Sequence, residues 1–232
     1  MACKRKYIDI YAADNLHTLG YEVYSDVIPI KDNIVEKLID YGRNGSQIFN
    51  HHETRLRNDH KRRQATLQRR SANLRNGIQD FVSEQFPHLT LKNLVVIHSK
   101  PGCGDQASHC DYVPEPNLAT VPDSHFPLAV LLAVMPGTKI SVWPRSIRFA
   151  YTSPTILQQI QPIHRKTLEL DIGDMLVFRG DLVHAGAAYD EENVRIHCFL
   201  DSELVPRTPN HTWLVHKDSC QELRDIIKSD NH

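Results

Sequence analysis

The fold is decided by residues 168–186, which read LELDIGDMLVFRGDLVHAG. This stretch predicts an apolar strand, a tight Gly-Asp turn at 173–174, a second apolar strand and then a histidine, His184, at a strand end. Short strands that follow one another through tight turns, with no helical pattern between them, are typical of a β-sandwich or jelly roll.

The same pattern continues through the chain after Pro87. Short β-branched or apolar runs are separated by turns that contain Pro-Gly, Gly-Asp or Asp-Glu-Glu-Asn. Strands are predicted at 91–98, 126–134, 139–143, 167–170, 175–178 and 194–200. A series of short strands of this kind predicts a double-stranded β-helix, the cupin-like jelly roll.

The residues before Pro87 are predicted to add helices that pack on this barrel. Residues 32–41 place their apolar side chains on one helical face, and Gly42 ends the pattern. Residues 64–86 carry apolar residues at helical spacings until Pro87. The remaining predicted elements are β-prone runs at 7–11 and 21–30 and a closing helix at 217–227.

The chain shows no internal repeat and no low-complexity linker, so one domain over residues 1–232 is predicted, mainly β with flanking helices. Residues 1–90 are expected to form the N-terminal helical support and the substrate region. Residues 91–205 are expected to form the jelly-roll core, and residues 206–232 a C-terminal tail or helix.

Composition narrows the class of protein. The chain is 41% hydrophobic and 24% charged with a formal net charge of −1, so bulk charge does not predict nucleic-acid binding. No apolar run approaches the roughly 18 residues of a membrane span. No apolar stretch follows the basic N-terminal residues, so no secretory signal is expected. Five cysteines, an odd number, favour reduced thiols in the cytoplasm or nucleus.

Three potential metal ligands stand out: His109 and Asp111, which flank Cys110, and the distant His184. Because side chains alternate along a strand, an HxD pair at a strand start presents both ligands on one face. A histidine on a facing strand then completes a triad. Two imidazoles and one carboxylate leave three neighbouring positions open, which suits non-haem Fe(II). The alternative for each histidine alone is an ordinary loop or core histidine.

Arg195 is the only positive charge in the apolar strand VRIHCFL, residues 194–200, and it follows His184 by eleven residues. Burying an arginine is costly unless it is paired with an anion. Its planar guanidinium suits bidentate recognition of a carboxylate. The strand therefore predicts a carboxylate-binding position beside the metal site.

These residues together resemble the superfamily of 2-oxoglutarate- and Fe(II)-dependent dioxygenases, including its prolyl-hydroxylase-like branch. The resemblance covers about residues 94–200, with the family's HxD…H…R motif at His109, Asp111, His184 and Arg195. It implies that the first three residues hold Fe(II) and that Arg195 binds the far carboxylate of the cosubstrate 2-oxoglutarate. It also implies that O2 is the oxidant.

Two positions depart from the family's pattern. Many relatives carry a hydroxyl residue two positions after the arginine, where this chain has His197. Period two places His197 on the same face as Arg195, so it is predicted either to donate to the same carboxylate or to be a core histidine bonded to the backbone. Lys100 stands where many relatives have a tyrosine. A cosubstrate other than 2-oxoglutarate is therefore kept as an alternative.

The resemblance implies hydroxylation or oxidative demethylation of a substrate, with release of succinate and CO2. Two other functions stay open: a cupin-like metalloenzyme that does not use 2-oxoglutarate, and a catalytically silent jelly-roll module for binding or sensing. The substrate is not identified, since a protein side chain, a modified nucleobase and a small metabolite all fit such a barrel.

A basic segment lies within the region predicted as the second helix. Between His51 and Arg75 there are eight arginines and lysines and two acidic residues. One interpretation is that the basic helix at residues 55–75 binds an anionic partner. The alternative is a solvated face of that helix.

Overall fold

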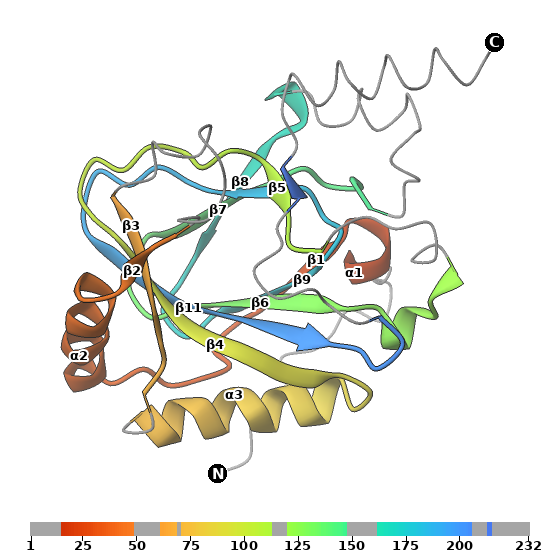
Figure 1. Ribbon diagram of the computed structural model, residues 1–232, viewed down its shortest axis with the longest axis horizontal. Coiled ribbons are helices and arrows are strands. Elements are labelled where there is room, and N and C mark those ends of the chain that lie inside the picture. Colours follow the sequence, from red (N-terminus) through yellow and green to blue (C-terminus); the bar gives the residue numbers. More distant parts are fainter. Residues whose placement is uncertain are drawn as a thin grey trace.

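The computed structural model describes residues 15–48, 61–68, 71–112, 120–147, 162–205 and 213–214. In these residues two antiparallel sheets face each other, and the two longer helices lie against the larger sheet (Figure 1). The predicted mainly β jelly roll with N-terminal helices packed on it is confirmed.

The larger sheet has seven strands in the described residues. Their order is β1 (Tyr21–Tyr24), β9 (Met175–Arg179), β6 (Leu128–Ala133), β11 (Asn193–Asp201), β4 (Thr90–Ser99), β3 (Arg62–Thr66) and β2 (Ser46–Gln47). The smaller sheet has the order β12 (Trp213–Leu214), β5 (His109–Cys110), β10 (His184–Gly186), β7 (Thr138–Val142) and β8 (Lys166–Leu170). Each of the six predicted strands is present within two residues of its expected bounds.

The helical elements are α1 (Asn15–Thr18), α2 (Asp32–Arg43) and α3 (Ala72–Gln85), with short 3-10 turns at Asp123–His125 and Pro162–His164. The first predicted helix is therefore α2, which runs on through Gly42 to Arg43. Predicted elements at 7–11 and 217–227 lie outside the described residues.

Strands β6 and β9 are buried on both faces, which explains their uninterrupted apolar sequences. The side chains that face the helices are Leu128, Val130, Leu132, Met175 and Val177. The side chains that face the smaller sheet are Ala129, Leu131, Ala133, Leu176 and Phe178. These two sets of side chains form apolar cores on the two faces of the larger sheet.

Strand β11 follows the same alternation but carries polar side chains on one face. Val194 and Ile196 pack in the cluster under the helices. Arg195, His197 and Phe199 alternate with them and so point between the sheets. Because β4 and β6 pair with β11 on either side, these three inward positions are held on a strand with neighbours along both edges.

The helix predicted at 64–86 is wrong at its start. Residues Arg62–Thr66 form β3, which pairs with the edge of β4, and α3 begins only at Ala72. Pairing with an open strand edge outweighs local helix preference in this segment. The basic helix at 55–75 is accordingly not a continuous helix in its described part, and the Arg62 side chain is fully buried rather than solvated.

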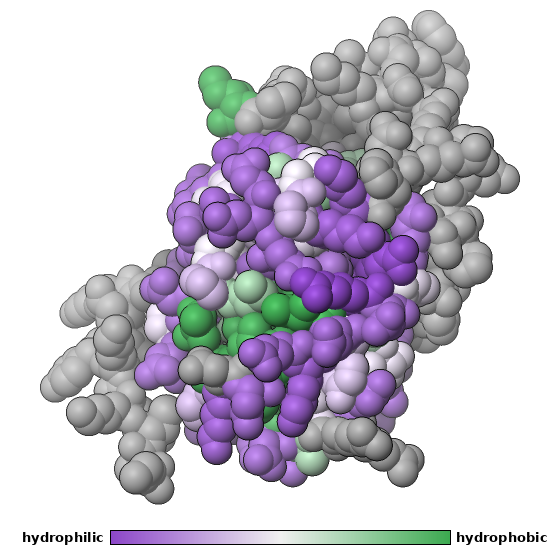
Figure 2. Space-filling model, turned by 90° about the vertical axis from the view of Figure 1, so that its left-hand side faces the viewer, coloured by the Kyte–Doolittle hydropathy of each residue, from purple (hydrophilic) through white to green (hydrophobic). Residues whose placement is uncertain are grey.

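The described surface is polar on the face shown in Figure 2, where hydrophilic residues surround one apolar area. Among the described residues, no helix has the length and apolar character needed to cross a membrane. Cys103, Cys110 and Cys198 are buried, and burial raises the pKa of the Cys198 thiol well above its usual range.

Gly42→Ala tests the packing of α2 on the larger sheet. An added Cβ at Gly42 would lie 2.4 Å from the Cβ of His98, so the helix must shift, and overpacking of this kind costs about 1–3 kcal/mol. The matched control is Gly77→Ala in α3, where the nearest atom, Ile28 Cδ1, lies 3.4 Å away. Urea unfolding should show a lower free energy of unfolding for Gly42→Ala than for the unmodified protein. Gly77→Ala should show no decrease in the free energy of unfolding. Equal changes in both would contradict this packing.

Candidate metal centre

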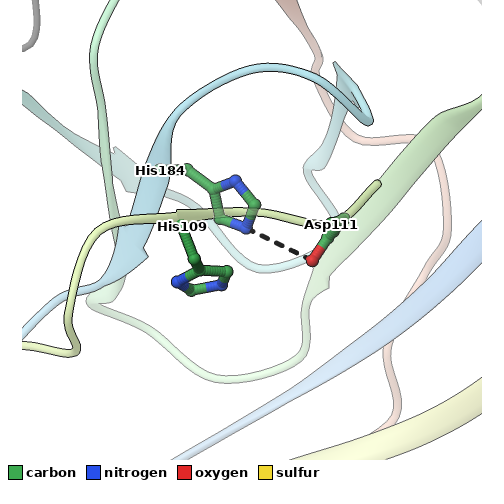
Figure 3. Close-up of side chains that lie close together, drawn as sticks. All are labelled: His109, Asp111 and His184. Carbon is green, nitrogen blue, oxygen red and sulfur yellow. Dashed lines mark ion pairs between the residues drawn. The ribbon is translucent and has the colours of Figure 1, made fainter. Parts of the chain in front are cut away.

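Short strands β5 and β10 bring together residues that are far apart in the sequence. His109 and His184 are directly opposite each other in the antiparallel pairing of these strands. Asp111 follows β5, with its side chain directed toward the same point (Figure 3). The sequence-predicted HxD pair and the distant histidine therefore converge as expected.

The three side chains form a compact buried group. One ligand atom from each of His109, Asp111 and His184 lies within 4.8 Å of the others, and all three residues are buried. His184 Nε2 is 3.6 Å from Asp111 Oδ1, and the two imidazole rings have centroids 4.3 Å apart. These distances suit three ligands around one ion that contacts each of them.

Backbone carbonyls fix the orientation of both imidazoles. His109 Nδ1 lies 2.8 Å from the carbonyl of Ala107, and His184 Nδ1 lies 3.0 Å from the carbonyl of Leu182. A carbonyl oxygen only accepts, so each Nδ1 carries the proton and donates it. The Nε2 lone pair of each ring is then available to a metal, as is usual for histidine ligands.

Electrostatics favour the ligand form of all three residues. Burial, reinforced by His184, lowers the pKa of His109 to about 3. Burial also lowers the pKa of His184, although Asp111 opposes that effect. Burial alone would raise the pKa of Asp111, but His184 and His197 outweigh it, so this pKa lies below its usual range. Neutral imidazoles beside a carboxylate are the protonation states that bind a cation.

A tight turn after β9 contacts Tyr112, the residue after Asp111, and leads along the chain to His184. Arg179 and Asp181 form a buried pair with two hydrogen bonds across this turn, at 2.9 and 3.0 Å. Between them, Gly180 accepts a hydrogen bond from the Tyr112 backbone N–H, and an added Cβ would lie 2.1 Å from the Tyr112 ring. Glycine is thus required for Tyr112, the neighbour of Asp111, to pack there. The Tyr112 hydroxyl also donates to Asp201, 2.5 Å away.

The loop that leads to His109 is held by contacts with the segment after His184. Gln106 and Gly186 form two hydrogen bonds. The Gln106 backbone N–H donates to the Gly186 carbonyl, and the Gly186 N–H donates to Gln106 Oε1. The guanidinium of Arg62 donates to the carbonyls of Gly104 and Ala187. Arg62 therefore has a structural role between these two segments.

Arg195 lies on the inward face of β11 and is 3% exposed. Its Nη1 donates to the hydroxyl of Ser99, 2.9 Å away, and its guanidinium lies over the Tyr189 ring at 5.2 Å from the centroid. The Tyr189 hydroxyl is itself fixed by the backbone of Lys139, with two contacts of 2.7 Å. The buried arginine predicted from sequence is thus present, in a polar and ordered setting.

His197 lies next to the metal ligands rather than beside Ser99. Its Nε2 is 3.3 Å from Asp111 Oδ2. Phe199 packs edge-on against its ring at a centroid distance of 4.8 Å, and the Phe178 ring lies tilted at 6.2 Å. The prediction that His197 shares a face with Arg195 agrees with this position, and the contact that the structure shows for its ring nitrogen is with Asp111.

Sequence reasoning did not identify Ser99 or the Tyr112–Asp201 pair. Ser99 lies at the end of a predicted strand, but only the pairing of β4 with β11 shows that it reaches Arg195. Cys110, by contrast, faces away from the triad into a small cluster with Trp143, Val183 and Ala185, as its place between the two ligands predicts.

The donor set fits a divalent cation of the iron type. It combines two neutral imidazoles with one carboxylate, which leaves further positions on the ion for other ligands. Asp111 Oδ2 is buried and, within the part of the chain described, makes no hydrogen bond. The Asp111 carboxylate as a whole is buried beside the two imidazoles, and a buried negative charge is costly unless a cation compensates it.

The sequence matches no family model and no curated protein. Several solved structures nevertheless match the fold. The epimerase SnoN, solved with Fe3+, α-ketoglutarate and nogalamycin RO, is 17% identical, with 84% of each chain covered and a TM-score of 0.58. HygX from Streptomyces hygroscopicus, solved with nickel, 2-oxoglutarate and hygromycin B, is 12% identical over 83% of this chain and 85% of its own, with a TM-score of 0.53.

A prolyl hydroxylase from Trichoplax adhaerens, solved with a peptide fragment of hypoxia inducible factor, is also similar. It is 15% identical over 82% of this chain and 86% of its own, with a TM-score of 0.54. At this level of identity the likeness establishes the fold. The chain therefore has the fold of the 2-oxoglutarate-dependent oxygenases, and the resemblance seen in its motifs is confirmed at that level.

The depressed pKa of His109 predicts how the metal-free protein responds to acid. The unfolded chain takes up a proton on His109 near pH 6.5, whereas the folded state does so only near pH 3. Stability is therefore lost as pH falls from about 6.5, by up to about 1.4 kcal/mol per pH unit for this site.

Urea unfolding in a chelator at pH 7.5 and 5.5 measures this loss. His109→Gln should reduce the pH dependence, while His164→Gln, at an exposed position, should leave it as in the unmodified protein. The same pH dependence in all three proteins would contradict the burial effect at His109.

Proposed function

We propose that this protein is an Fe(II)- and 2-oxoglutarate-dependent dioxygenase that hydroxylates or oxidatively demethylates a substrate. The observation that carries the proposal is the convergence of His109, Asp111 and His184 beside an inward-facing, buried Arg195. When bound, Fe(II) and 2-oxoglutarate supply the O2-dependent oxidation of a substrate C–H bond, with release of succinate and CO2.

The protein's own contribution begins with the three ligands. His109 and His184 present neutral nitrogens whose direction is fixed by the carbonyls of Ala107 and Leu182. Asp111 supplies the single negative charge among them. These three residues would hold the ion, and a set of only three protein ligands would leave it able to take a bidentate oxoacid and O2.

Arg195 and Ser99 form a cradle for the far carboxylate of the oxoacid. The Ser99 hydroxyl accepts a hydrogen bond from Arg195, so it keeps its own proton to donate to an anion. The guanidinium supplies the charge and further donors. Ser99 thus takes the place of the hydroxyl residue that relatives carry two positions after the arginine.

The spacing along β11 agrees with the size of such a cosubstrate. His197 contacts Asp111, and Arg195 is the next inward position on the same strand. Alternate residues on a strand are roughly 6.6 Å apart, which is comparable with the length of a five-carbon diacid. Phe178 and Phe199 beside His197 provide apolar walls that help to exclude water from the reacting atoms.

The two alternative functions are less well supported. A cupin-like metalloenzyme that does not use 2-oxoglutarate gives no reason for Arg195 and Ser99 to be paired inside the barrel. A catalytically silent module gives no reason to keep all three ligands. The solved structures of similar fold carry different bound molecules, including hygromycin B and a peptide fragment, so the fold does not select a substrate class.

An anionic partner of residues 55–75 was one interpretation of the sequence, and the structure limits which basic residues of this segment could bind it. Arg62 is fully buried and bonded to the carbonyls of Gly104 and Ala187. Any binding by this segment would therefore use other basic residues, among which Lys61 is more exposed and bonded to the Pro101 and Gly102 carbonyls.

The proposal is tested by turnover of 2-oxoglutarate in the absence of added substrate. Purified protein supplied with Fe(II), 2-oxoglutarate, ascorbate and O2 should release succinate slowly. Asp111→Ala or His109→Ala should abolish this release because an incomplete triad holds iron poorly. His164→Gln serves as a histidine control outside the site. Oxoacid-independent chemistry, or iron binding without any succinate, would favour one of the two alternative functions.

Arg195→Ala should weaken 2-oxoglutarate binding by roughly 10- to 100-fold, because it removes charged hydrogen bonds to a carboxylate. Ser99→Ala should weaken it by roughly fivefold, and Ser99→Thr, which keeps the hydroxyl, should weaken it less. The measurement is the KM for 2-oxoglutarate at saturating Fe(II). A KM unchanged in Arg195→Ala would remove this residue from cosubstrate binding.

A further inference from the structure

The two oxygens of the Asp111 carboxylate face different partners. Oδ1 is directed to the triad and lies 3.6 Å from His184 Nε2. Oδ2 is directed to the larger sheet and lies 3.3 Å from His197 Nε2. Oδ2 makes no other close contact with a basic group that the described residues show, and it lacks a hydrogen bond of good geometry there.

His197 belongs to a different sheet from the metal ligands. His109 and His184 come from the smaller sheet, whereas His197 comes from β11 in the larger one. Its backbone is paired on both sides, opposite Val95 of β4 and Leu131 of β6. The imidazole therefore reaches Asp111 from β11, and the position of β11 is set by its pairing with β4 and β6 rather than by the metal ligands.

A local irregularity accompanies this position. The pairing of β11 with β4 shifts register between His197 and Phe199. On β4, Asn93 has a positive φ of 48°, a backbone conformation in which asparagine is among the more tolerant residues. Strand bulges bend a strand and re-aim its side chains, and they are frequent next to active sites. The extra residue lies on β4, whereas β11 keeps an unbroken register with β6 from Arg195 to Leu200, so the bulge bends β4 beside the strand that carries His197.

A metal-bound carboxylate needs a second contact to keep its orientation. An aspartate that is free to rotate exchanges between one and two metal-bound oxygens, and the number of open positions on the ion changes with it. Partners that hold the other oxygen set this orientation and commonly matter for metal affinity. A buried carboxylate oxygen also needs a donor in its own right. His197 Nε2 is placed to satisfy both needs.

We propose that His197 is a positioning residue for Asp111: its Nε2–H donates to Oδ2 and leaves Oδ1 as a single metal-directed ligand. This role replaces the oxoacid contact expected from the sequence pattern. It rests on the metal site of the proposed function but not on the identity of the cosubstrate. The present 3.3 Å contact shortens on metal binding, since such bonds are often long before the site is complete.

His197 is not proposed as a fourth ligand. The set of mutually close ligand atoms in the described residues consists of His109, Asp111 and His184. His197 lies behind the carboxylate, on the side of Oδ2. Its aromatic neighbours Phe178 and Phe199 pack against its ring and restrict it to this side.

The test measures metal binding alone, without oxoacid. Mn(II) affinity is determined by electron paramagnetic resonance for the unmodified protein, His197→Phe, His197→Leu and His197→Gln. The two variants without a donor should bind Mn(II) roughly 10- to 100-fold more weakly. His197→Gln, whose amide N–H can replace Nε2–H, should recover most of the affinity. The Co(II) absorption spectrum should change in the donor-free variants and return toward the unmodified form in His197→Gln.

Ser99→Ala is the matched control because it alters the other end of the site. It should leave Mn(II) affinity unchanged and weaken N-oxalylglycine binding at saturating metal. His197→Leu should weaken Mn(II) binding and leave N-oxalylglycine binding at saturating metal unchanged. Unchanged Mn(II) affinity in both donor-free variants, or no recovery in His197→Gln, would overturn the proposal. Weaker N-oxalylglycine binding in His197→Leu at saturating metal would instead return His197 to the oxoacid.

These outcomes are independent of the enzymatic activity. If succinate is never formed but the Mn(II) affinities follow the predicted order, the role of His197 stands and the proposed dioxygenase function fails. If succinate is formed but the Mn(II) affinities are equal, the converse holds. Circular dichroism of each variant establishes that it is folded before the affinities are compared.

Discussion

The pairing of His109 with His184 across β5 and β10 is the constraint on which the site depends. Two residues that are directly opposite on antiparallel strands have side chains on the same face at close range. The imidazoles are therefore brought together by backbone hydrogen bonding, before any metal is considered. The segments that flank the two strands must therefore pack closely. Gly180 lies against Tyr112 and Gly186 lies against Gln106, and neither position has space for a Cβ.

Much of the fold was predictable because its signals are local. Strands such as β6 and β9 are buried on both faces, so their sequences are continuously apolar, and the turn before β9 contains Gly173 at a φ of 90°. The triad was predictable because HxD spacing and strand alternation bring two ligands to one face. Strand β3 was not, since Arg62–Thr66 has no alternation of its own and is strand only because β4 offers it an edge.

Contacts across strands are the part that one sequence could not supply. Ser99 and Arg195 are far apart in the chain, and nothing in either segment indicates that the two side chains meet. The same holds for His197, whose contact with Asp111 nothing in the sequence indicates. Alternation fixes the side of a sheet on which a residue lies, whereas the neighbour it meets depends on register and on the distance between sheets.

The site also straddles the two sheets, and the role proposed for His197 depends on this arrangement. His109 and His184 stand on short strands of the smaller sheet and Asp111 follows one of them, while the proposed cosubstrate cradle stands on β4 and β11 of the larger sheet. Their relative position depends on the apolar core between the sheets, and the His197–Asp111 contact joins the two parts at the site itself. A serine or threonine at position 197 is too short to reach Asp111 from β11 in this way. In the proposed arrangement position 197 serves Asp111, and the hydroxyl beside Arg195 comes from another strand, where Ser99 at the end of β4 already bonds the guanidinium.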